Sequence, residues 1–166
     1  MPRRHPLPKL WLLTDERQGD ALWRAIARLP RGSGIIVRHY SLSRADRQRL
    51  FTRIRALGRA RGLIVILAGH NYRHGDPRLA SAHNLSEIRA AERARADILL
   101  LSPLFATRSH PGRPTLGTLK FATLARATRL PVLALGGVMR HHEPLIARIG
   151  AYGRAGIDDF VKRRVS

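Results

Sequence analysis

Cysteine is absent from this chain of 166 residues, and acidic and aromatic residues are scarce. Without a thiol, the protein forms no disulfide and uses no thiolate as a nucleophile or metal ligand. No apolar run reaches the roughly 20 residues that a membrane-spanning helix needs. The basic start, Met1–Lys9, also lacks the apolar segment of a secretory signal. We therefore expect a cytoplasmic protein with no membrane partner.

Acidic residues number 11 against 31 lysines and arginines, so the formal net charge is +20. Nearly all of the basic residues are arginines, since Lys9, Lys120 and Lys162 are the only lysines. The arginines are spread along the chain and aromatics make up only 5% of it, which is not the pattern of a dedicated nucleic-acid binder. The charge predicts a solvated arginine-rich surface and non-specific binding to polyanions.

Apolar runs of strand character alternate along the chain with segments whose apolar residues have helical spacing. The predicted strands are residues 9–14, 34–38, 63–69, 79–83, 97–102, 131–135 and 155–161. The predicted helices are residues 20–29, 43–60, 85–95, 118–128 and 143–150. This alternation is typical of a parallel α/β sheet. The length and the hydrophobic content of 44% predict a single domain over residues 1–166.

Polar loops rich in glycine, hydroxyl and basic residues follow two neighbouring predicted strands. One spans Ser102–Gly117, and the other begins at Gly136 and Gly137, directly after Pro131–Leu135. Such loops place backbone N–H groups, hydroxyls and positive charge at one point, which is the environment that phosphate oxygens require. The two loops therefore predict a phosphorylated ligand on top of a β/α barrel.

These loops resemble those of the thiamine phosphate synthase family and of its thiazole tautomerase relatives. In that family one strand runs into Pro-x-Phe-x-Thr-x-Thr/Ser-Lys and the next ends in Ala-Ile-Gly-Gly; here Pro103–His110 and Ala134–Gly137 stand in those places. Leu10–Asp15, Ile36–Arg38 and Ser81–Glu87 extend the resemblance more weakly along the chain. The resemblance implies an α/β fold of the parallel (β/α) TIM-barrel type.

The chain is shorter than the family's barrel by about one βα unit, roughly 30 residues. Seven strands are predicted where the closed barrel has eight. The difference falls in residues 70–78, where the family has a helix, a strand and a further helix. A parallel barrel without one strand must close around a gap, borrow a strand from a partner or stay partly open. A homodimer across that edge is one of the arrangements left open.

In this family an aminopyrimidine pyrophosphate ionises to a carbocation and pyrophosphate, and the nitrogen of a thiazole phosphate then attacks the cation. The resemblance thus implies a transferase of thiamine biosynthesis that acts on small phosphorylated substrates. It assigns Arg38 and His110 to the pyrophosphate. It assigns the thiazole phosphate to Thr107, Ser109, Gly136 and Gly137.

The family also uses Mg²⁺, held by an Asn-Asp pair after the third strand and by a carboxylate on the strand that this chain lacks. Here Leu67–His70 stands after the third strand, and Tyr40 and His110 each replace a lysine. Mg²⁺ is therefore expected from the family, but the sequence matches none of its ligands. Single carboxylates that could contribute are Asp15, Asp76 and Asp158.

Two alternative functions stay open beside the synthase. A thiazole tautomerase moves a proton on a thiazole carboxylate phosphate without a metal, and its acid/base is the histidine of a Ser-Val-His-Ser motif. Ser81–Asn84 lies at the matching junction, so that His83 would fill this role, because an imidazole both donates and accepts protons near neutral pH. The other alternative is a non-catalytic relative that kept the phosphate loops and lost the metal site.

Overall fold

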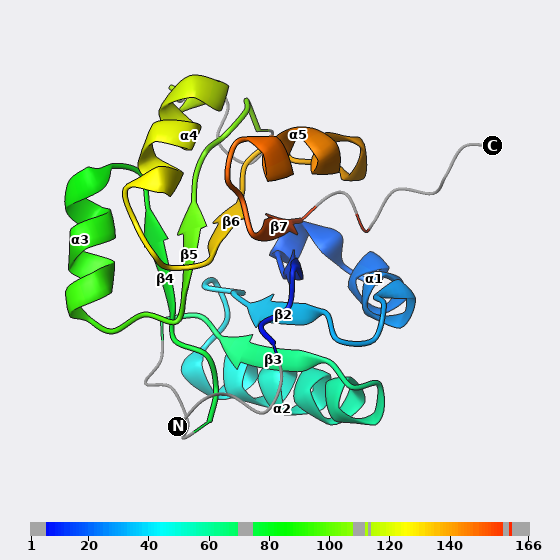
Figure 1. Cartoon of the computed structure of the whole chain (residues 1–166). Helices are drawn as coiled ribbons and strands as arrows, with labels where there is room; N and C mark the ends of the chain where they lie inside the picture. The colour runs from blue at the N-terminus through cyan, green and yellow to red at the C-terminus, as the bar shows by residue number, and fades with distance from the viewer. Residues whose placement is uncertain (1–5, 70–74, 108–111, 113, 158–159, 161–166) are drawn as a thin grey trace.

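The computed structural model describes residues 6–69, 75–107, 112, 114–157 and 160. Its seven strands form one parallel sheet that curls into a half-barrel, with the helices on the outside (Figure 1). The strands are β1 (Leu10–Leu13), β2 (Gly34–Val37), β3 (Ile64–Leu67), β4 (Leu79–Ala82), β5 (Ile98–Leu101), β6 (Val132–Ala134) and β7 (Gly153–Gly156). The helices are α1 (Ala21–Arg28), α2 (Arg44–Ala60), α3 (Leu85–Arg93), α4 (Gly117–Arg126) and α5 (Glu143–Arg148), with the 3₁₀ turns η1 (Glu16–Gln18) and η2 (Arg140–His142).

The strands follow the order β3-β2-β1-β7-β6-β5-β4, and every neighbouring pair is parallel. The first strand, β1, therefore pairs with the last strand, β7, as it would in a closed barrel. Strands β3 and β4 form the two edges of the sheet. These edges lie where residues 70–78 connect them in sequence. The TIM-barrel-like α/β fold, shortened by about one βα unit at this place, is confirmed.

The last strand lies two residues earlier than its apolar pattern predicts, at Gly153–Gly156 instead of residues 155–161. Its glycines explain the shift. A Cβ at Gly153 would lie 2.1 Å from the backbone oxygen of Lys9, so this strand needs a residue without a side chain to approach the chain entering β1. A search for apolar residues cannot detect this need for glycine.

Side chains on the concave side of the sheet form a continuous apolar cluster. Because successive residues of a strand point to opposite faces, Trp11 and Leu13 of β1 face this interior, whereas Leu12 faces the helices. In the same way Ile98 and Leu100 of β5 point inward. All of these side chains are almost completely buried, so the interior is a packed core and any ligand is left to the rim.

Trp11 fills the interior at β1 because β2 makes room for it. A Cβ at Gly34 would lie 2.1 Å from the Trp11 ring, and the ring is fully buried with its indole N–H donating to the Pro8 carbonyl at 2.7 Å. The pairing of the largest apolar side chain with the smallest residue across neighbouring strands keeps the interior dense.

The outer face of the sheet is covered by helices in two groups. Leu12, Ile35 and Val65 pack with α1 and α2, whereas Leu99 and Leu101 pack with α3 and α4. The predicted helix starts are also confirmed in two places, where Ser43 caps α2 and Asn84 caps α3. In the described residues, no helix is long and apolar enough to cross a membrane.

Candidate active site

The polar residues that follow the strands gather at one rim of the half-barrel, because the carboxyl ends of parallel strands lie at the same edge of the sheet. The described residues there are Thr14 and Asp15 after β1, Arg38 and His39 after β2, His83 after β4, Ser102 after β5, and Gly136 and Gly137 after β6. The rim divides into two parts. One surrounds β4, β5 and β6, and the other surrounds β1, β2 and β3.

The loops after β5 and β6 are joined by backbone hydrogen bonds. The N–H of Leu104 donates to the Leu135 carbonyl at 2.9 Å, and the N–H of Phe105 donates to the Gly136 carbonyl at 3.0 Å. The two glycines allow this approach. With φ of +94° and +62°, a Cβ on Gly136 would lie 2.7 Å from the Pro103 Cβ, and one on Gly137 would lie 2.4 Å from the Ala106 oxygen.

The same geometry leaves backbone donors at the rim. Within the described residues, the N–H groups of Gly136 and Gly137 donate no hydrogen bond. Half-buried Thr107 lies on the partner loop, at the end of its described part. Ser109 and His110, the other residues predicted for this part of the site, lie outside the described residues. Neighbouring N–H groups in a positive-φ turn form a concavity that suits phosphate oxygens.

His83 lies after β4, next to the loop of β5. Its Nδ1 is 2.7 Å from the Ser102 carbonyl oxygen and 3.4 Å from the Ser102 hydroxyl. A carbonyl oxygen only accepts, so Nδ1 carries the proton and donates, and Nε2 of the neutral ring keeps its lone pair. The backbone N–H of His83 donates to Glu87 at 2.7 Å, which ties this residue to the first turn of α3. His83 is thus an oriented imidazole, and its Nε2 makes no hydrogen bond within the described part of the chain.

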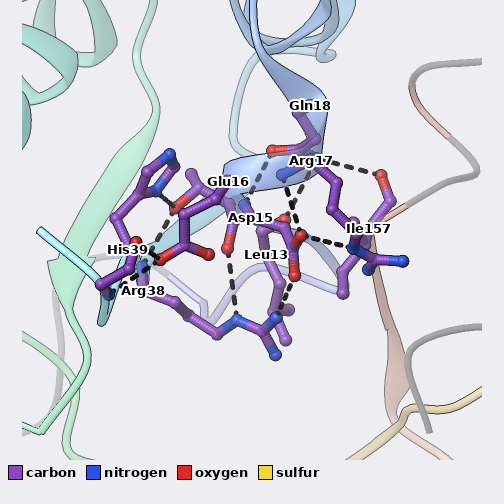
Figure 2. A network of polar contacts seen from close by, with 10 residues as sticks. Leu13, Asp15, Glu16, Arg17, Gln18, Arg38, His39 and Ile157 are labelled. Atoms are coloured by element: carbon purple, nitrogen blue, oxygen red, sulfur yellow. Dashed lines mark hydrogen bonds and ion pairs between the residues drawn. The ribbon is translucent and has the colours of Figure 1, made fainter.

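Arg38 is held by an ion pair at the end of β2 (Figure 2). Its Nη2 lies 2.7 Å from Asp15 Oδ2, and its Nε donates to the Thr14 carbonyl at 3.2 Å. Asp15 is nearly buried, and its other oxygen accepts from the Arg17 side chain at 2.7 Å. Burial raises the pKa of Asp15, but the hydrogen bonds from Arg17 and the charges of both arginines outweigh it, so the pKa is below 3.8.

His39 adjoins this ion pair, and its backbone has the unusual φ of +39°. The Thr14 hydroxyl accepts from the Arg38 backbone N–H at 3.0 Å and shares a hydrogen bond of 2.9 Å with His39 Nδ1. Burial, which disfavours a charged ring, lowers the pKa of His39. Hydrogen bonds from Ser41 lower the pKa of Glu16, on the other side of the network. Burial thus disfavours a charge on His39 within this group of charged residues.

Arg47 is part of the rim although it is not among the site residues predicted from the sequence. It projects from the start of α2, where its Nε donates to the Arg38 carbonyl and its Nη2 donates to the Ala68 carbonyl after β3. Its guanidinium carbon also lies 4.8 Å from the ring centroid of Tyr40. A cation in the first turn of a helix opposes the helix dipole, and this misfit is the one signal in the sequence that could have indicated another role for Arg47.

The described residues of the rim do not fit a divalent metal. They contain no group of three or more histidine, aspartate or glutamate side chains that could hold a metal ion together. Asp15, one of the three carboxylates that the sequence offers, uses both oxygens in ion pairs with arginines. Asp76 is paired with Arg55 at 3.2 Å, and Asp158 lies outside the described residues. Mg²⁺ prefers several oxygen ligands, and this set does not offer them.

Sequence comparisons point to one family. Residues 80–160 match the family described as thiamine monophosphate synthase. A protein of Aquifex aeolicus named after thiamine-phosphate synthase is 38% identical over 82 residues, which are 49% of this chain and 44% of that protein. The thiamine-phosphate synthase of Chloroflexus aurantiacus is 34% identical over 82 residues, which are 49% of this chain and 38% of that protein. Each match thus spans less than half of the curated relative.

Solved structures match nearly the whole chain. The thiamine phosphate pyrophosphorylase from Pyrococcus furiosus superimposes with a TM-score of 0.77 at 17% identity, over 94% of this chain and 88% of that one. A FabK variant from Thermotoga maritima superimposes with a TM-score of 0.55 at 14% identity, over 93% of this chain and 62% of that one. At these identities the likeness shows the fold alone.

Proposed function

We propose that this chain, a member of the thiamine monophosphate synthase family, is a thiamine phosphate synthase-like transferase. In this proposal it couples an aminopyrimidine pyrophosphate to a thiazole phosphate. The observation that carries it is the junction of the loops after β5 and β6, where the N–H groups of Gly136 and Gly137 donate to no described acceptor. This junction falls within the residues that match the family.

The thiazole phosphate is proposed to bind at that junction. Gly136 and Gly137 would supply backbone donors, and Thr107 and Ser109 would supply hydroxyl groups. Donors fixed by the backbone need no reorganisation when an anion arrives, which favours phosphate binding. Arg38 and His110 are assigned to the pyrophosphate of the other substrate. Mg²⁺ belongs to the chemistry of the family, but the described residues do not fit it, so no step is assigned to a metal here.

The wider setting of the protein is part of the same proposal. We expect one domain over residues 1–166, small phosphorylated substrates and a cytoplasmic location. The edges at β3 and β4 offer backbone groups to a second copy of the chain, and a homodimer would pair them. Analytical ultracentrifugation at rising protein concentration tests this point, since a monomer at every concentration would contradict it.

Titration with thiazole phosphate, followed by isothermal calorimetry, tests the phosphate site. The double variant Thr107→Ala/Ser109→Ala should weaken binding by about 1–3 kcal/mol, which is the usual range for hydrogen bonds to a charged group. Thr52→Ala/Ser86→Ala is the matched control, because it removes two exposed hydroxyls from the outer helices α2 and α3. Equal affinity of the two double variants would contradict the assignment.

The tautomerase function is a second candidate, favoured by the tautomer of His83. With Nδ1 donating to Ser102, the free Nε2 is suited to take a proton from a thiazole carboxylate phosphate. The test follows deuterium uptake by that compound by NMR. A tautomerase loses this uptake in His83→Gln, whereas a synthase forms thiamine phosphate from both substrates. A non-catalytic relative binds the thiazole phosphate and does neither.

A further inference from the structure

In its described residues, the part of the rim around β1, β2 and β3 has two fixed guanidinium groups and no cluster of side chains that could hold a metal ion. We infer that Arg38 and Arg47 bind a diphosphate anion directly here, and that the guanidinium of Arg47 takes the place of the divalent cation. The inference rests on the proposed function, because it concerns the pyrophosphate half of the same rim. It departs from the family pattern, in which carboxylates hold Mg²⁺ at the end of the third strand.

Arg47 brings its charge to the place where the family pattern is broken. It donates to the carbonyls of Arg38 and Ala68, and thereby bridges the carboxyl ends of β2 and β3. Its guanidinium also faces Tyr40, which stands where the family has a lysine. A fixed cation thus lies beside the end of the third strand and beside the position of the replaced lysine.

Both arginines keep donors for a ligand. Arg38 uses Nε and Nη2 for Thr14 and Asp15, and Arg47 uses Nε and Nη2 for backbone carbonyls. Neither Nη1 has a partner among the described residues, and neither is among the completely buried unpaired atoms. Guanidinium groups held in this way match the oxygens of a phosphate and lose little entropy on binding.

The charges nearby favour an anion over a cation. Asp15 is neutralised by Arg17 and Arg38, each at 2.7 Å, so a metal ion could use this carboxylate only by breaking an ion pair. Burial lowers the pKa of His39 and so disfavours a charge on its ring. Among the described residues, a divalent cation would therefore meet two arginines and no available carboxylate pair, whereas a diphosphate would meet two guanidinium donors.

Calorimetric titration with inorganic pyrophosphate, once in EDTA and once with excess Mg²⁺, tests the inference. We expect binding in EDTA that is at least as tight as binding of the magnesium complex. Arg47→Gln should weaken binding in EDTA by about tenfold or more, the range for a charge-assisted contact. The control is Arg49→Gln, on the same helix, whose arginine is 73% exposed and pairs with Asp46; it should bind as the wild type does.

The Asp15→Asn variant should change the affinity for pyrophosphate in the opposite direction to Arg47→Gln. If the arginines bind the anion directly, removing the carboxylate that pairs with Arg38 should tighten pyrophosphate binding in EDTA. If Asp15 serves a metal, the same change should weaken binding in Mg²⁺. Should Arg47→Gln fail to fold by circular dichroism, Arg47→Lys keeps the charge without the guanidinium fork, and is expected to bind several-fold more weakly than the wild type.

Three results would overturn the inference: pyrophosphate binding that requires Mg²⁺, no pyrophosphate binding at all, or equal affinity of the position 47 and position 49 variants. The proposed function is judged separately, by thiazole phosphate titration. If the wild type does not bind thiazole phosphate, the result counts against that function. The pyrophosphate titrations would still decide the role of Arg47.

Discussion

Comparing Gly136→Ala with Gly150→Ala separates the backbone strain of an alanine at positive φ from the cost of moving apart the loops after β5 and β6. Gly136 and Gly150 share a φ of +94°, which costs an alanine about 1–2 kcal/mol at either position. At Gly136 the new Cβ would also lie 2.7 Å from the Pro103 Cβ and 2.8 Å from its Cα, whereas at Gly150 the nearest atom is the Ala125 Cβ at 3.6 Å. Overpacking of this kind adds about 1–3 kcal/mol.

We therefore expect Gly136→Ala to lower the free energy of unfolding by about 2–5 kcal/mol, and Gly150→Ala by about 1–2 kcal/mol. Urea unfolding followed by circular dichroism measures both. Gly136→Ala should in addition weaken thiazole phosphate binding, because the Pro103 segment must move relative to the N–H groups of Gly136 and Gly137. Equal destabilisation of the two variants, with unchanged phosphate affinity, would refute the claim that these loops are held in contact by glycine.

Three further predictions concern the core, the pH dependence and the surface. Gly34→Ala should destabilise the fold by about 3 kcal/mol and shift the tryptophan fluorescence, because the new Cβ would lie 2.1 Å from the Trp11 ring. The pKa of His39 is lowered in the folded state, so the unfolded state binds its proton first and stability should fall as the pH drops below 6.5. Urea unfolding between about pH 7.5 and about pH 5.5 measures this dependence, and His39→Asn should make it less steep. An unchanged dependence in the variant would contradict the role given to His39. Binding to a short DNA duplex, measured by fluorescence anisotropy, should weaken about a hundredfold or more between about 50 and 200 mM salt, and salt-independent binding would exclude an origin in the net charge.

Most of the fold could be predicted from the sequence because its signals are local. Leu63–Leu67 and Ile98–Leu101 are apolar on both faces, as parallel strands between helices must be, and Asn84 caps a helix with its own side chain. The exception, Gly153–Gly156, shows the limit. That strand is set by the close approach of Lys9, more than a hundred residues away in sequence, which no local pattern reports.

The candidate site could be predicted from the sequence only where the residue types within a single loop indicate it. Gly136 and Gly137 mark the β6 end directly, and their contact with Pro103 and Phe105 agrees with two loops at one edge. Arg38 is visible in the sequence, but its ion pair with Asp15 depends on the pairing of β1 with β2. Arg47 reaches the rim from a helix, and its partners are backbone carbonyls, which look alike in every sequence.

The cut between β3 and β4 also changes the mechanics of the molecule. In a closed barrel each strand is hydrogen-bonded to a neighbour on both sides, so the barrel resists deformation. In this open sheet β3 and β4 each have a neighbour on one side only. Bending of the sheet about β7 is limited by the three residue pairs that link β1 to β7 and the two that link β6 to β7. Arg38 and Arg47 lie on one side of β7 in the sheet, and the turn at Gly136 and Gly137 lies on the other side. A ligand with an anionic group at each end would link these two sides and stiffen the open sheet, as an additional strand would in a closed barrel.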